Sequence, residues 1–176
     1  MKLEVNKAAV LGAGVMGAQI AAHLANANVP VVLFDLPAKE GDKNGVVKKA
    51  LDGLKRQQPS PLVTRDKLQY IDAANYEEHL ELLSGCDLII EAIAERMDWK
   101  YDLYSKIAPF LPSTAVIASN TSGLSINALA DSLPEALRPN FCGIHFFNPP
   151  RYMPLVEIIA TRSTDPATLD GLETWL

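Results

Sequence analysis

The stretch AAVLGAGVMG, residues 8–17, is the clearest indication of the fold of this chain. A short apolar run of strand length leads directly into three glycines spaced as GxGxxG, and Ala18–Ala27 follows with a composition that favours a helix. A second apolar run, Val31–Asp35, comes next. This order of strand, glycine turn, helix and strand predicts a parallel βαβ unit.

Each glycine of the turn has its own physical role. Gly12 permits the tight turn after the strand, Gly14 leaves room for a pyrophosphate to approach the backbone, and Gly17 lets the helix lie close to the strand. The first helical residues, Val15 and Met16, contribute free N–H groups at the positive end of the helix dipole, where phosphate groups bind. The spacing and its context predict a dinucleotide-binding site.

The acidic residue Asp35 indicates which dinucleotide binds. It stands at the end of the second strand, where a carboxylate can accept hydrogen bonds from ribose hydroxyls and would repel a 2′-phosphate. The next residues, Leu36 and Pro37, supply no arginine for such a phosphate. The sequence therefore favours NAD(H) over NADP(H), and NAD over FAD. The alternative interpretation is a glycine turn and an exposed carboxylate without any ligand.

Apolar runs of strand length recur along the chain, and the segments between the earlier ones are long enough for helices. These runs are Asp87–Ile93, Ala115–Ala118, Phe141–Phe147 and Leu155–Ile159. Such alternation predicts an α/β fold of the Rossmann type, a doubly wound and mostly parallel sheet covered by helices on both faces. Between residues 36 and 87 the pattern loosens, and we expect an excursion with a helix over Gly45–Gln58 rather than a second domain.

The composition describes one globular domain over residues 1–176, with 48% hydrophobic residues and a formal net charge of −5. Because Lys and Arg are spread along the chain, neither a nucleic acid nor an anionic membrane is expected as a partner. No apolar run approaches the ~18 residues of a membrane span. The first residues do not resemble a signal peptide, so we expect a cytoplasmic protein. Cys86 and Cys142 lie in apolar runs without metal-ligand spacing, which predicts reduced core thiols and no metal site.

Polar side chains follow several of the predicted strands, at the edge where open parallel sheets bind ligands. Three sets qualify: Glu95 with Lys100, the stretch Ser119–Gly123, and His145 with Asn148. We interpret them as one strand-end cluster facing the dinucleotide site.

Ordinary structural roles are an alternative for part of this cluster. Glu95 and Lys100 have the spacing of a solvated ion pair at a helix start. Thr121, Ser122 or Ser125 has the residue type that caps a helix, here one running to residue 130. For the isolated His145, the alternative is a histidine satisfied within the core.

A hairpin predicted near the C-terminus gives His145 a partner. Asn148–Arg151 is typical of a turn, and Leu155–Ile159 of a returning strand. In an antiparallel pairing centred on Arg151, the numbers of opposed residues sum to 302, so His145 lies opposite Glu157. Opposed Cβ atoms are about 4.5–5.5 Å apart, within reach of an imidazole–carboxylate hydrogen bond. The pair suits a general base whose tautomer a carboxylate fixes; the alternative is an ion-paired hairpin without a catalytic role.

The last segment predicts a helix over Ala167–Leu176. Asp165 and Pro166 have the residue types of an N-cap and a first helical position. No C-cap signal follows, and a helix ending on Trp175 and Leu176 would expose the side chains that its pattern assigns to a core. We therefore expect residues 1–176 to be a piece of a longer protein.

Taken together, these segments resemble the NAD-binding domain of the 3-hydroxyacyl-CoA dehydrogenases over essentially the full chain. The matching stretches are residues 9–17 (AVLGAGVMG), 90–95 (IEAIAE), 119–122 (SNTS) and 145–150 (HFFNPP). Residues 148–152 and the insert over 43–62 are most similar to large bacterial fatty-acid-oxidation proteins, in which this dehydrogenase is fused to an enoyl-CoA hydratase-like region. The family continues into a helical domain, for which this chain has no matching segment.

The resemblance implies roles for the strand-end residues. The catalytic dyad of the family falls on His145 and Glu157, and the hydroxyl that helps to hold the substrate oxygen falls on Ser122. The nicotinamide-side contacts fall on Glu95, Lys100 and Asn148, of which Asn148 also belongs to the catalytic set, and the ribose carboxylate falls on Asp35.

The implied activity is the NAD-dependent, reversible oxidation of an L-3-hydroxyacyl-CoA to a 3-ketoacyl-CoA in fatty-acid β-oxidation, with an acyl-CoA as substrate. In the family, the helical domain completes the site and forms the dimer, so we expect homo-oligomers only of a longer protein. The chain alone is expected to bind NAD(H) with little or no turnover. Two alternatives stay open: a dehydrogenase acting on another small hydroxy acid, and an NAD-binding module without turnover.

Overall fold

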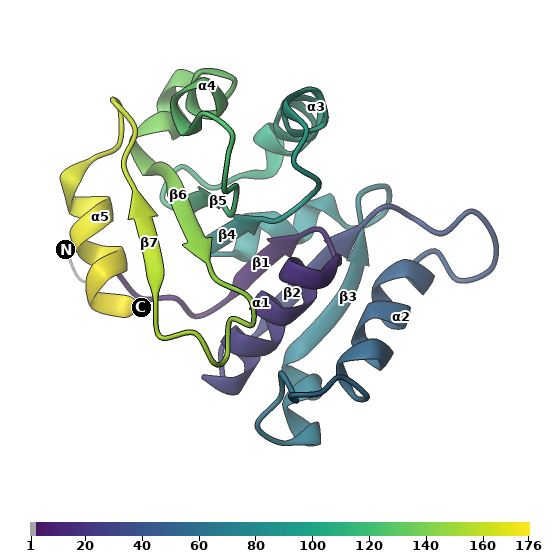
Figure 1. The fold of residues 1–176 in the computed structure, drawn as a ribbon. Coiled ribbons are helices and arrows are strands. Elements are labelled where there is room, and N and C mark those ends of the chain that lie inside the picture. The colour runs from purple at the N-terminus through teal and green to yellow at the C-terminus, as the bar shows by residue number, and fades with distance from the viewer. Residues whose placement is uncertain (1–2) are drawn as a thin grey trace.

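The structure is a computed structural model that describes residues 3–176. Its centre is one seven-stranded sheet with the order β3-β2-β1-β4-β5-β6-β7 (Figure 1). The strands are β1 (Ala8–Leu11), β2 (Val31–Asp35), β3 (Ile71–Asn75), β4 (Leu88–Glu91), β5 (Val116–Ser119), β6 (Phe141–Phe146) and β7 (Val156–Ile159). Neighbouring strands are parallel except β6 and β7, which pair antiparallel. The predicted Rossmann-type sheet with its C-terminal hairpin is confirmed.

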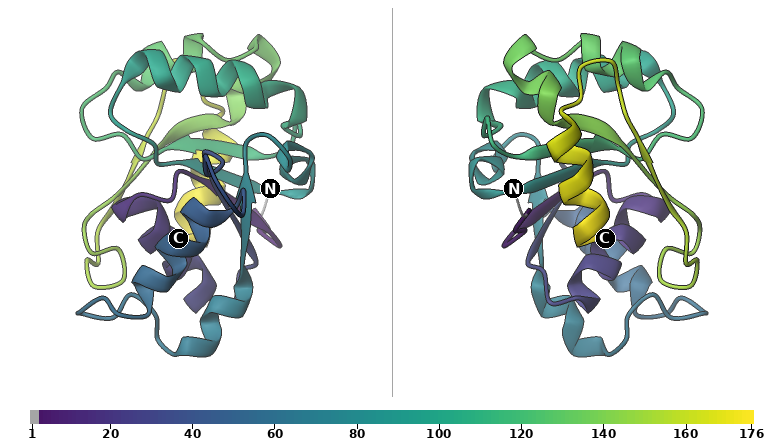
Figure 2. Two further views of the ribbon diagram at one scale, coloured as in Figure 1. Left: turned by 90° about the vertical axis from the view of Figure 1, so that its right-hand side faces the viewer. Right: turned by 90° about the vertical axis from the view of Figure 1, so that its left-hand side faces the viewer.

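Helices cover both faces of this sheet (Figure 2). The α-helices are α1 (Val15–Asn26), α2 (Gly45–Leu54), α3 (Met97–Ile107), α4 (Ile126–Asp131) and α5 (Pro166–Trp175). Short 3₁₀ helices complete the chain: η1 (Arg65–Tyr70), η2 (Leu80–Gly85), η3 (Ala108–Phe110) and η4 (Glu135–Asn140). Helices α1, α2 and α5 pack on one face, and α3 and α4 pack on the other. Within residues 3–176, no helix has the length and apolar character needed to cross a membrane.

The two faces have separate hydrophobic cores because side chains alternate along each strand. In β1, Ala8 and Val10 belong to the core under α1, whereas Ala9 and Leu11 belong to the core under α3. All four side chains are fully buried. A central parallel strand buried on both faces is therefore a continuous apolar run, as the sequence of β1 is.

Strand β3 is an element that the sequence pattern did not predict. It pairs in parallel with β2 at the sheet edge, inside the region that we expected to be a loose excursion. Its sequence, IDAAN, contains one β-branched residue and an exposed charged residue, Asp72, so its local strand signal is weak. Pairing with β2 makes this segment a strand. The helix expected over Gly45–Gln58 does form, but it ends at Leu54.

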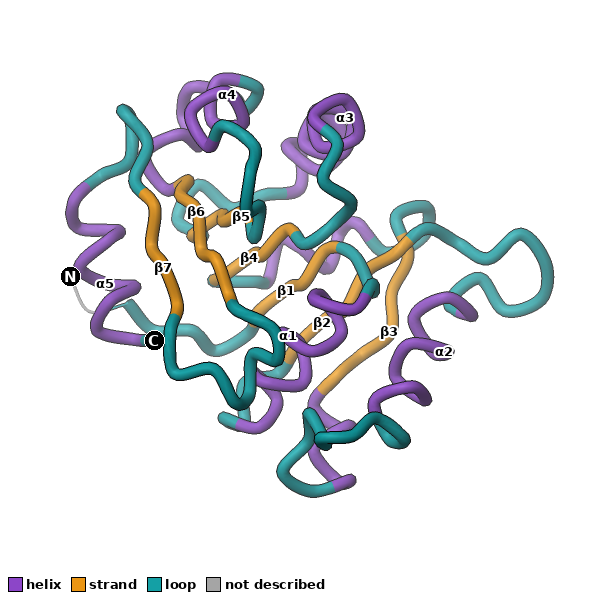
Figure 3. Tube along the Cα trace, viewed as in Figure 1, coloured by secondary structure: helices purple, strands orange, loops and turns teal. Residues whose placement is uncertain are grey.

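The excursion stays attached to the main body of the domain. Its first loop, between β2 and α2, projects from the side of the molecule (Figure 3). Its second loop is held by the turn of the β6–β7 hairpin, where Arg151 Nη1 donates to the carbonyl oxygens of Ser60 and Leu62, each at 2.7 Å. The Tyr152 hydroxyl donates to the same Ser60 carbonyl at 2.8 Å. The predicted turn after Asn148 therefore connects the hairpin to the excursion.

The C-terminal helix α5 packs on the domain's own sheet (Figure 2, right). Asp165 caps it as predicted, accepting a hydrogen bond from the Ala167 N–H at 2.8 Å. Leu172 is fully buried, and Trp175 packs partly buried against the same core. The expected exposure of apolar side chains holds for Leu176 but not for Leu172 and Trp175, because the core on this face of the sheet supplies an apolar surface for them. Among its large apolar residues, Leu176 is the exposed one.

Candidate functional site

The candidate site lies where the strand order reverses, between β1 and β4. The chain leaves β1 toward β2 and β3 and later returns on the other side of β1 through β4, β5 and β6. Loops that leave β1 and β4 in opposite directions open a crevice at the carboxyl edge of the sheet. The Gly12 N–H donates to the Phe34 carbonyl at 2.8 Å, and the Ala92 N–H donates to the Leu11 carbonyl at 2.8 Å. These bonds hold both loops at the ends of their strands.

The three glycines of the turn are required for different reasons. Gly12 has a φ of +104°, and a Cβ there would come within 2.8 Å of the Ala92 carbonyl oxygen. A Cβ on Gly17 would lie 1.8 Å from the Gly12 carbonyl oxygen. A Cβ on Gly14 would meet no protein atom within 4 Å. The first two glycines serve the fold, whereas Gly14 keeps open the space in front of α1.

The open space in front of Gly14 is suited to an anion. Gly14 is the N-cap residue of α1, and no side chain caps this helix. The first N–H groups of a helix have no intrahelical partner, and they add to the positive end of the helix dipole. Val15, whose side chain is 69% exposed, borders the same space. A phosphate-bearing ligand fits this set of donors.

Asp35 closes the turn from the side of β2. Its Oδ2 accepts a hydrogen bond from the Ala13 N–H at 2.6 Å, and its Oδ1 accepts one from the Leu36 N–H at 2.7 Å. A carboxylate has about four lone-pair sites, so both oxygens can accept further bonds. Asp35 therefore both orders the glycine turn and presents acceptors to a ligand beside it.

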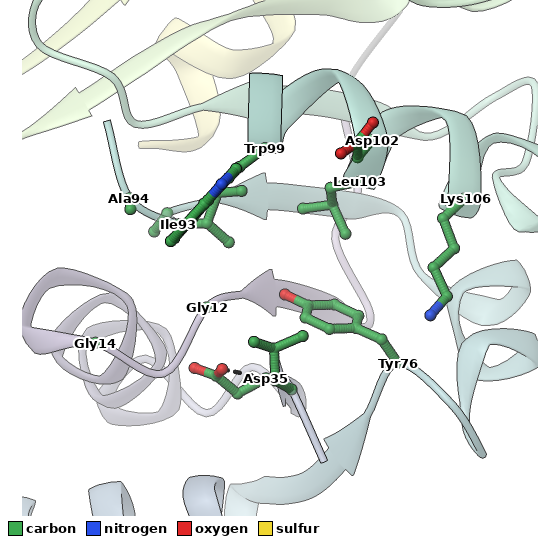
Figure 4. A pocket seen from close by; sticks show the side chains of 12 residues that line it. Gly12, Gly14, Asp35, Tyr76, Ile93, Ala94, Trp99, Asp102, Leu103 and Lys106 are labelled. Carbon is green, nitrogen blue, oxygen red and sulfur yellow. Dashed lines mark hydrogen bonds between the residues drawn. The ribbon is translucent and has the colours of Figure 1, made fainter. Parts of the chain in front are cut away.

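Two adjoining pockets occupy the crevice. The first, here the glycine-turn pocket, has a volume of about 450 Å³ and a mostly apolar lining (Figure 4). Its labelled walls include Gly12, Asp35, Tyr76, Trp99 and Lys106. Tyr76, Trp99 and Lys106 were not predicted from the sequence. Tyr76 follows the unpredicted strand β3, and the exposed aromatic ring of Trp99 among charged residues on α3 was an available but unused signal.

The second pocket, here the histidine pocket, has a volume of about 600 Å³. It shares Gly14 and the segment 92–94 with the glycine-turn pocket, so the two form one continuous site. The predicted site residues that line it are Gly14, Val15, Met16, Glu95, Ser122, His145 and Asn148. Residues that are far apart in the sequence are thus brought together as predicted.

The predicted pairing of His145 with Glu157 is confirmed. The two residues are directly opposed in the β6–β7 register, and His145 Nδ1 lies 2.8 Å from Glu157 Oε2. A carboxylate accepts hydrogen bonds, so in the neutral imidazole this contact favours the tautomer with the proton on Nδ1 and the lone pair on Nε2. The imidazole is 19% exposed and packs against Phe147 at a ring-centroid distance of 4.6 Å. This arrangement leaves Nε2 as the basic atom of a residue that lines the histidine pocket.

Glu95 organises the loop that follows β5. Its Oε1 accepts hydrogen bonds from the Thr121 hydroxyl and from the N–H groups of Ser122 and Gly123, the latter two at 2.9 Å. Partial burial favours a higher pKa for this carboxyl, but these hydrogen bonds and the charge of Lys100 outweigh it, and the pKa of Glu95 lies below its usual value. Glu95 therefore stays ionised and fixes the wall of the pocket that carries Ser122.

The cap of helix α4 is Ser125, whose Oγ accepts from the Ala128 N–H at 3.3 Å. The alternative that a hydroxyl of this segment serves as a helix cap therefore holds for Ser125. Ser122 is not used in this way, and its hydroxyl lies 3.4 Å from Glu95 at the pocket wall.

Lys100, on helix α3, has a buried side chain and is not among the residues that line either pocket. Its side chain is 1% exposed, and its ammonium group is 2.5 Å from Oε1 of the fully buried Glu91. Glu95 Oε2 is 3.9 Å away. The interpretation of Glu95 and Lys100 as a solvated pair is wrong, because the side chain of Lys100 is buried between its own helix, α3, and Glu91 at the end of β4. Direct contact of Lys100 with a cofactor stays a prediction, and the structure places Glu95 between its ammonium group and the histidine pocket.

Asn148 has a partner that the sequence did not suggest. Gln19 of α1, whose side chain is 3% exposed, donates from Nε2 to Asn148 Oδ1 at 3.3 Å. The Asn148 Nδ2 group therefore keeps its donors for a ligand in the histidine pocket. A buried glutamine in an otherwise apolar helix face was the available signal.

Cys86 and Cys142 are free and buried, as predicted. Burial raises the pKa of Cys86 to about 11 and that of Cys142 to about 12. Neither thiol borders either pocket. Both are core residues of the fold.

Comparisons with known proteins identify the family of the chain. The family model described as "3-hydroxyacyl-CoA dehydrogenase, NAD binding domain" matches residues 7–176. The chain belongs to this family. The cofactor predicted from Asp35 and the glycine turn, NAD, is the cofactor of the family's domain. Relatives of this 3-hydroxyacyl-CoA dehydrogenase domain are oxidoreductases by name.

The relatives of the domain are considerably longer proteins. A Rickettsia felis protein named as a fatty acid oxidation complex trifunctional enzyme is 48% identical over 160 residues, which are 90% of this chain and 22% of that protein. A Deinococcus radiodurans protein named as a 3-hydroxyacyl-CoA dehydrogenase is 42% identical over 93% of this chain and 48% of its own length. The chain thus spans about a fifth to a half of these relatives.

Solved structures show the same architecture. The crystal structure of 3-hydroxybutyryl-CoA dehydrogenase from Escherichia coli matches with a TM-score of 0.82 and 30% identity, covering 97% of this chain and 35% of that one. The (S)-3-hydroxybutyryl-CoA dehydrogenase from Ralstonia eutropha matches with a TM-score of 0.80 and 30% identity, covering 98% of this chain and 60% of that one. The Rossmann-type fold of the domain is thereby shown by its structural neighbours as well as by its own sheet.

Proposed function

We propose that this domain binds NAD(H) across both pockets and supplies the catalytic base for the reversible oxidation of an L-3-hydroxyacyl-CoA to a 3-ketoacyl-CoA. The adenosine half lies in the glycine-turn pocket, where Asp35 accepts hydrogen bonds from ribose hydroxyls. The pyrophosphate lies before Gly14 at the N-terminus of α1. The nicotinamide half lies in the histidine pocket, with Glu95 and Asn148 beside it. This arrangement is supported by the open space at Gly14 and by the shared walls of the two pockets.

NAD⁺, when bound, supplies the acceptor for the hydride that leaves C3 of the substrate. His145 Nε2 takes the proton of the 3-hydroxyl group as general base. Glu157 accepts the Nδ1–H throughout, which holds the tautomer and stabilises the imidazolium that forms. In the reverse direction the same imidazolium returns the proton to the 3-keto oxygen.

Ser122 and Asn148 are proposed to hold the reacting oxygen in place. Both line the histidine pocket with His145, and both side chains carry hydrogen-bond donors. Hydrogen bonds to the oxygen from Ser122 Oγ orient the substrate relative to Nε2, which lowers the entropic part of the barrier. The observation that carries this function is the His145–Glu157 hydrogen bond of 2.8 Å at the wall of a pocket shared with the glycine turn.

The chain by itself is proposed to bind NADH with little turnover. Both pockets are formed within residues 3–176, so cofactor binding needs no further segment. The relatives of known structure are longer, and productive turnover also requires the acyl chain to be held. The cytoplasmic location, the assembly of a longer protein into homo-oligomers and the role in β-oxidation stay predictions.

The test compares substrates and cofactors. We expect NADH to bind the 176-residue chain in calorimetric titration, and NADPH to bind more weakly. A longer protein that contains this chain should reduce acetoacetyl-CoA with NADH, and should reduce free acetoacetate much more slowly. A preference for the free acid would support a dehydrogenase of small hydroxy acids instead. A rate for residues 1–176 equal to that of the longer protein would contradict the proposal of little turnover.

A further inference from the structure

The carboxylate of Glu91 is a buried ionisable group to which the mechanism above gives no role. It ends strand β4, and it is 0% exposed. Four groups donate hydrogen bonds to it. Oε1 accepts from the Ile93 N–H at 2.7 Å and from Lys100 Nζ at 2.5 Å, and Oε2 accepts from Tyr104 Oη at 3.1 Å and Ser119 Oγ at 2.6 Å.

The stability of the fold is a poor explanation for the buried ion pair of Glu91 with Lys100. Moving two charges out of water costs several kcal/mol per ion, and an apolar pair of similar volume in such a position is often as stable. Tyr104 belongs to the otherwise apolar core under α3, packed edge-on against Phe141 at a centroid distance of 5.9 Å. Burial raises the pKa of Tyr104 well above its usual value, so its hydroxyl remains a donor to Glu91. The charges of Glu91 and Lys100 therefore indicate a role other than packing.

The contacts of Lys100 indicate that purpose. Its ammonium group is held between Glu91 Oε1 and Glu95 Oε2, at 2.5 and 3.9 Å. The other oxygen of Glu95 accepts the N–H groups of Ser122 and Gly123. Glu91, Lys100, Glu95 and the 121–123 loop thus form one chain of charged contacts from the core to the wall of the histidine pocket.

The main chain of Glu91 reaches the same wall by a second route. Its carbonyl oxygen accepts the Asn120 N–H at 2.7 Å. Asn120 Oδ1 in turn accepts the N–H of Phe146, next to His145, at 2.9 Å. Glu91 is therefore connected to the walls of the histidine pocket by two routes, one through its side chain and Lys100 and one through its carbonyl group and Asn120.

We infer that Glu91 is the positioning residue of the histidine pocket, holding the Lys100 ammonium group so that Glu95 and the Ser122 loop keep the geometry that the nicotinamide half and substrate require. The part of this inference that concerns the nicotinamide half and the substrate rests on the proposed function. The part that concerns the geometry of Glu95 and the Ser122 loop does not. Glu91 touches neither pocket and acts through Lys100 and Glu95.

The test removes both buried charges together, and the ionised group that then loses a partner is Glu95, whose side chain is 42% exposed. Glu91→Gln alone leaves the buried Lys100 ammonium group without its nearer anion and lowers the melting temperature strongly. The double variant Glu91→Gln with Lys100→Met removes both charges and should recover most of the lost thermal stability. In this double variant we expect the amides of Ser122 and Gly123 to exchange hydrogen about tenfold faster, and NADH to bind about tenfold more weakly, as expected for weakened charge-assisted hydrogen bonds. AMP, which needs only the glycine-turn pocket, should bind as it does to the wild type.

A milder variant and a control accompany the double variant. Tyr104→Phe removes one hydrogen bond to Glu91 and keeps both charges, and it should move amide exchange and NADH affinity in the same direction by a smaller factor. Asp52→Asn with Lys55→Met removes an exposed pair of similar type, Nζ to Oδ1 2.6 Å, and should change neither. Wild-type amide exchange and NADH affinity in a folded double variant, or in Tyr104→Phe, would overturn the inference. Failure of the wild type to bind NADH would instead contradict the proposed function, and amide exchange would still test Glu91.

Discussion

The glycine-turn pocket and the histidine pocket adjoin on one sheet edge, yet they are built in different ways. The glycine-turn pocket has a mostly apolar lining, with the backbone of the glycine turn and the carboxylate of Asp35 on one side and side chains of α3 on the other. The histidine pocket carries polar side chains from the segments that follow β4 and β5 and from β6 and its following turn, beside the apolar residues Val15 and Met16 of α1. A backbone site tolerates many changes at its rim, whereas a side-chain site depends on each partner. The two halves should therefore respond differently to substitution.

The largest difference is expected for His145. In a longer protein that contains this chain, His145→Gln should lower the turnover of acetoacetyl-CoA reduction about 10²–10⁴-fold, because the general base is lost. The affinity for NADH should change little, since the glycine turn is intact. Glu157→Gln should lower turnover in the same direction, because a neutral amide stabilises the imidazolium less. Near-normal turnover of His145→Gln would remove this residue from the catalytic role.

The glycine turn itself offers a matched pair of substitutions. Gly17→Ala places a Cβ against the Gly12 carbonyl and should destabilise the fold by about 1–3 kcal/mol, as overpacking does. Gly14→Ala places a Cβ in open space, so the unfolding free energy should stay near that of the wild type. NADH affinity of Gly14→Ala should fall by about tenfold or more as phosphate hydrogen bonds weaken. Denaturant unfolding and calorimetry together separate the two effects, and equal NADH affinity for Gly14→Ala and the wild type would show that no phosphate binds there.

Asp35 tests the glycine-turn pocket by its side chain. Asp35→Ala should weaken NADH binding by roughly 1.5–3 kcal/mol, because a charged acceptor for the ribose hydroxyls is lost. Asp35→Asn keeps the shape and removes the charge, and it should reduce the preference for NADH over NADPH. Calorimetric titration measures both. The same NADH affinity in Asp35→Ala as in the wild type would remove Asp35 from the ribose.

The smallest effect concerns the pH dependence of the histidine pocket. The pKa of Glu95 is lowered in the folded protein, so this carboxylate stabilises the fold fully above its unfolded pKa, and the contribution is lost as the pH falls through the lower folded value. The wild type should therefore unfold less readily than Glu95→Gln at pH 7, and the difference should shrink between about pH 5 and pH 2. A difference that stays constant over this range would show that the Glu95 charge does not hold the 121–123 loop.

The parts of the site that depend on local spacing were predictable from the amino-acid sequence alone. Three glycines after an apolar run specify a turn before a helix, because φ, Cβ clashes and helix geometry are set within a few residues. The pairing of His145 with Glu157 was predictable because strand residues alternate and a short turn sets the register. Asp35 and the N-cap Asp165 were likewise found from residues close to them in the chain.

Which side chains are enclosed by neighbouring elements became clear from the three-dimensional packing and could not be predicted from the sequence. Strand β3 forms through pairing with β2, and Tyr76 reaches the glycine-turn pocket because of it. Lys100 is buried because α3 packs over the end of β4, where Glu91 provides an anion that no spacing rule identifies. Helix α5 buries Leu172 because the sheet supplies an apolar surface. Burial is a property of packed layers, and a hydrophobicity pattern along one segment does not contain the surface that another segment presents to it.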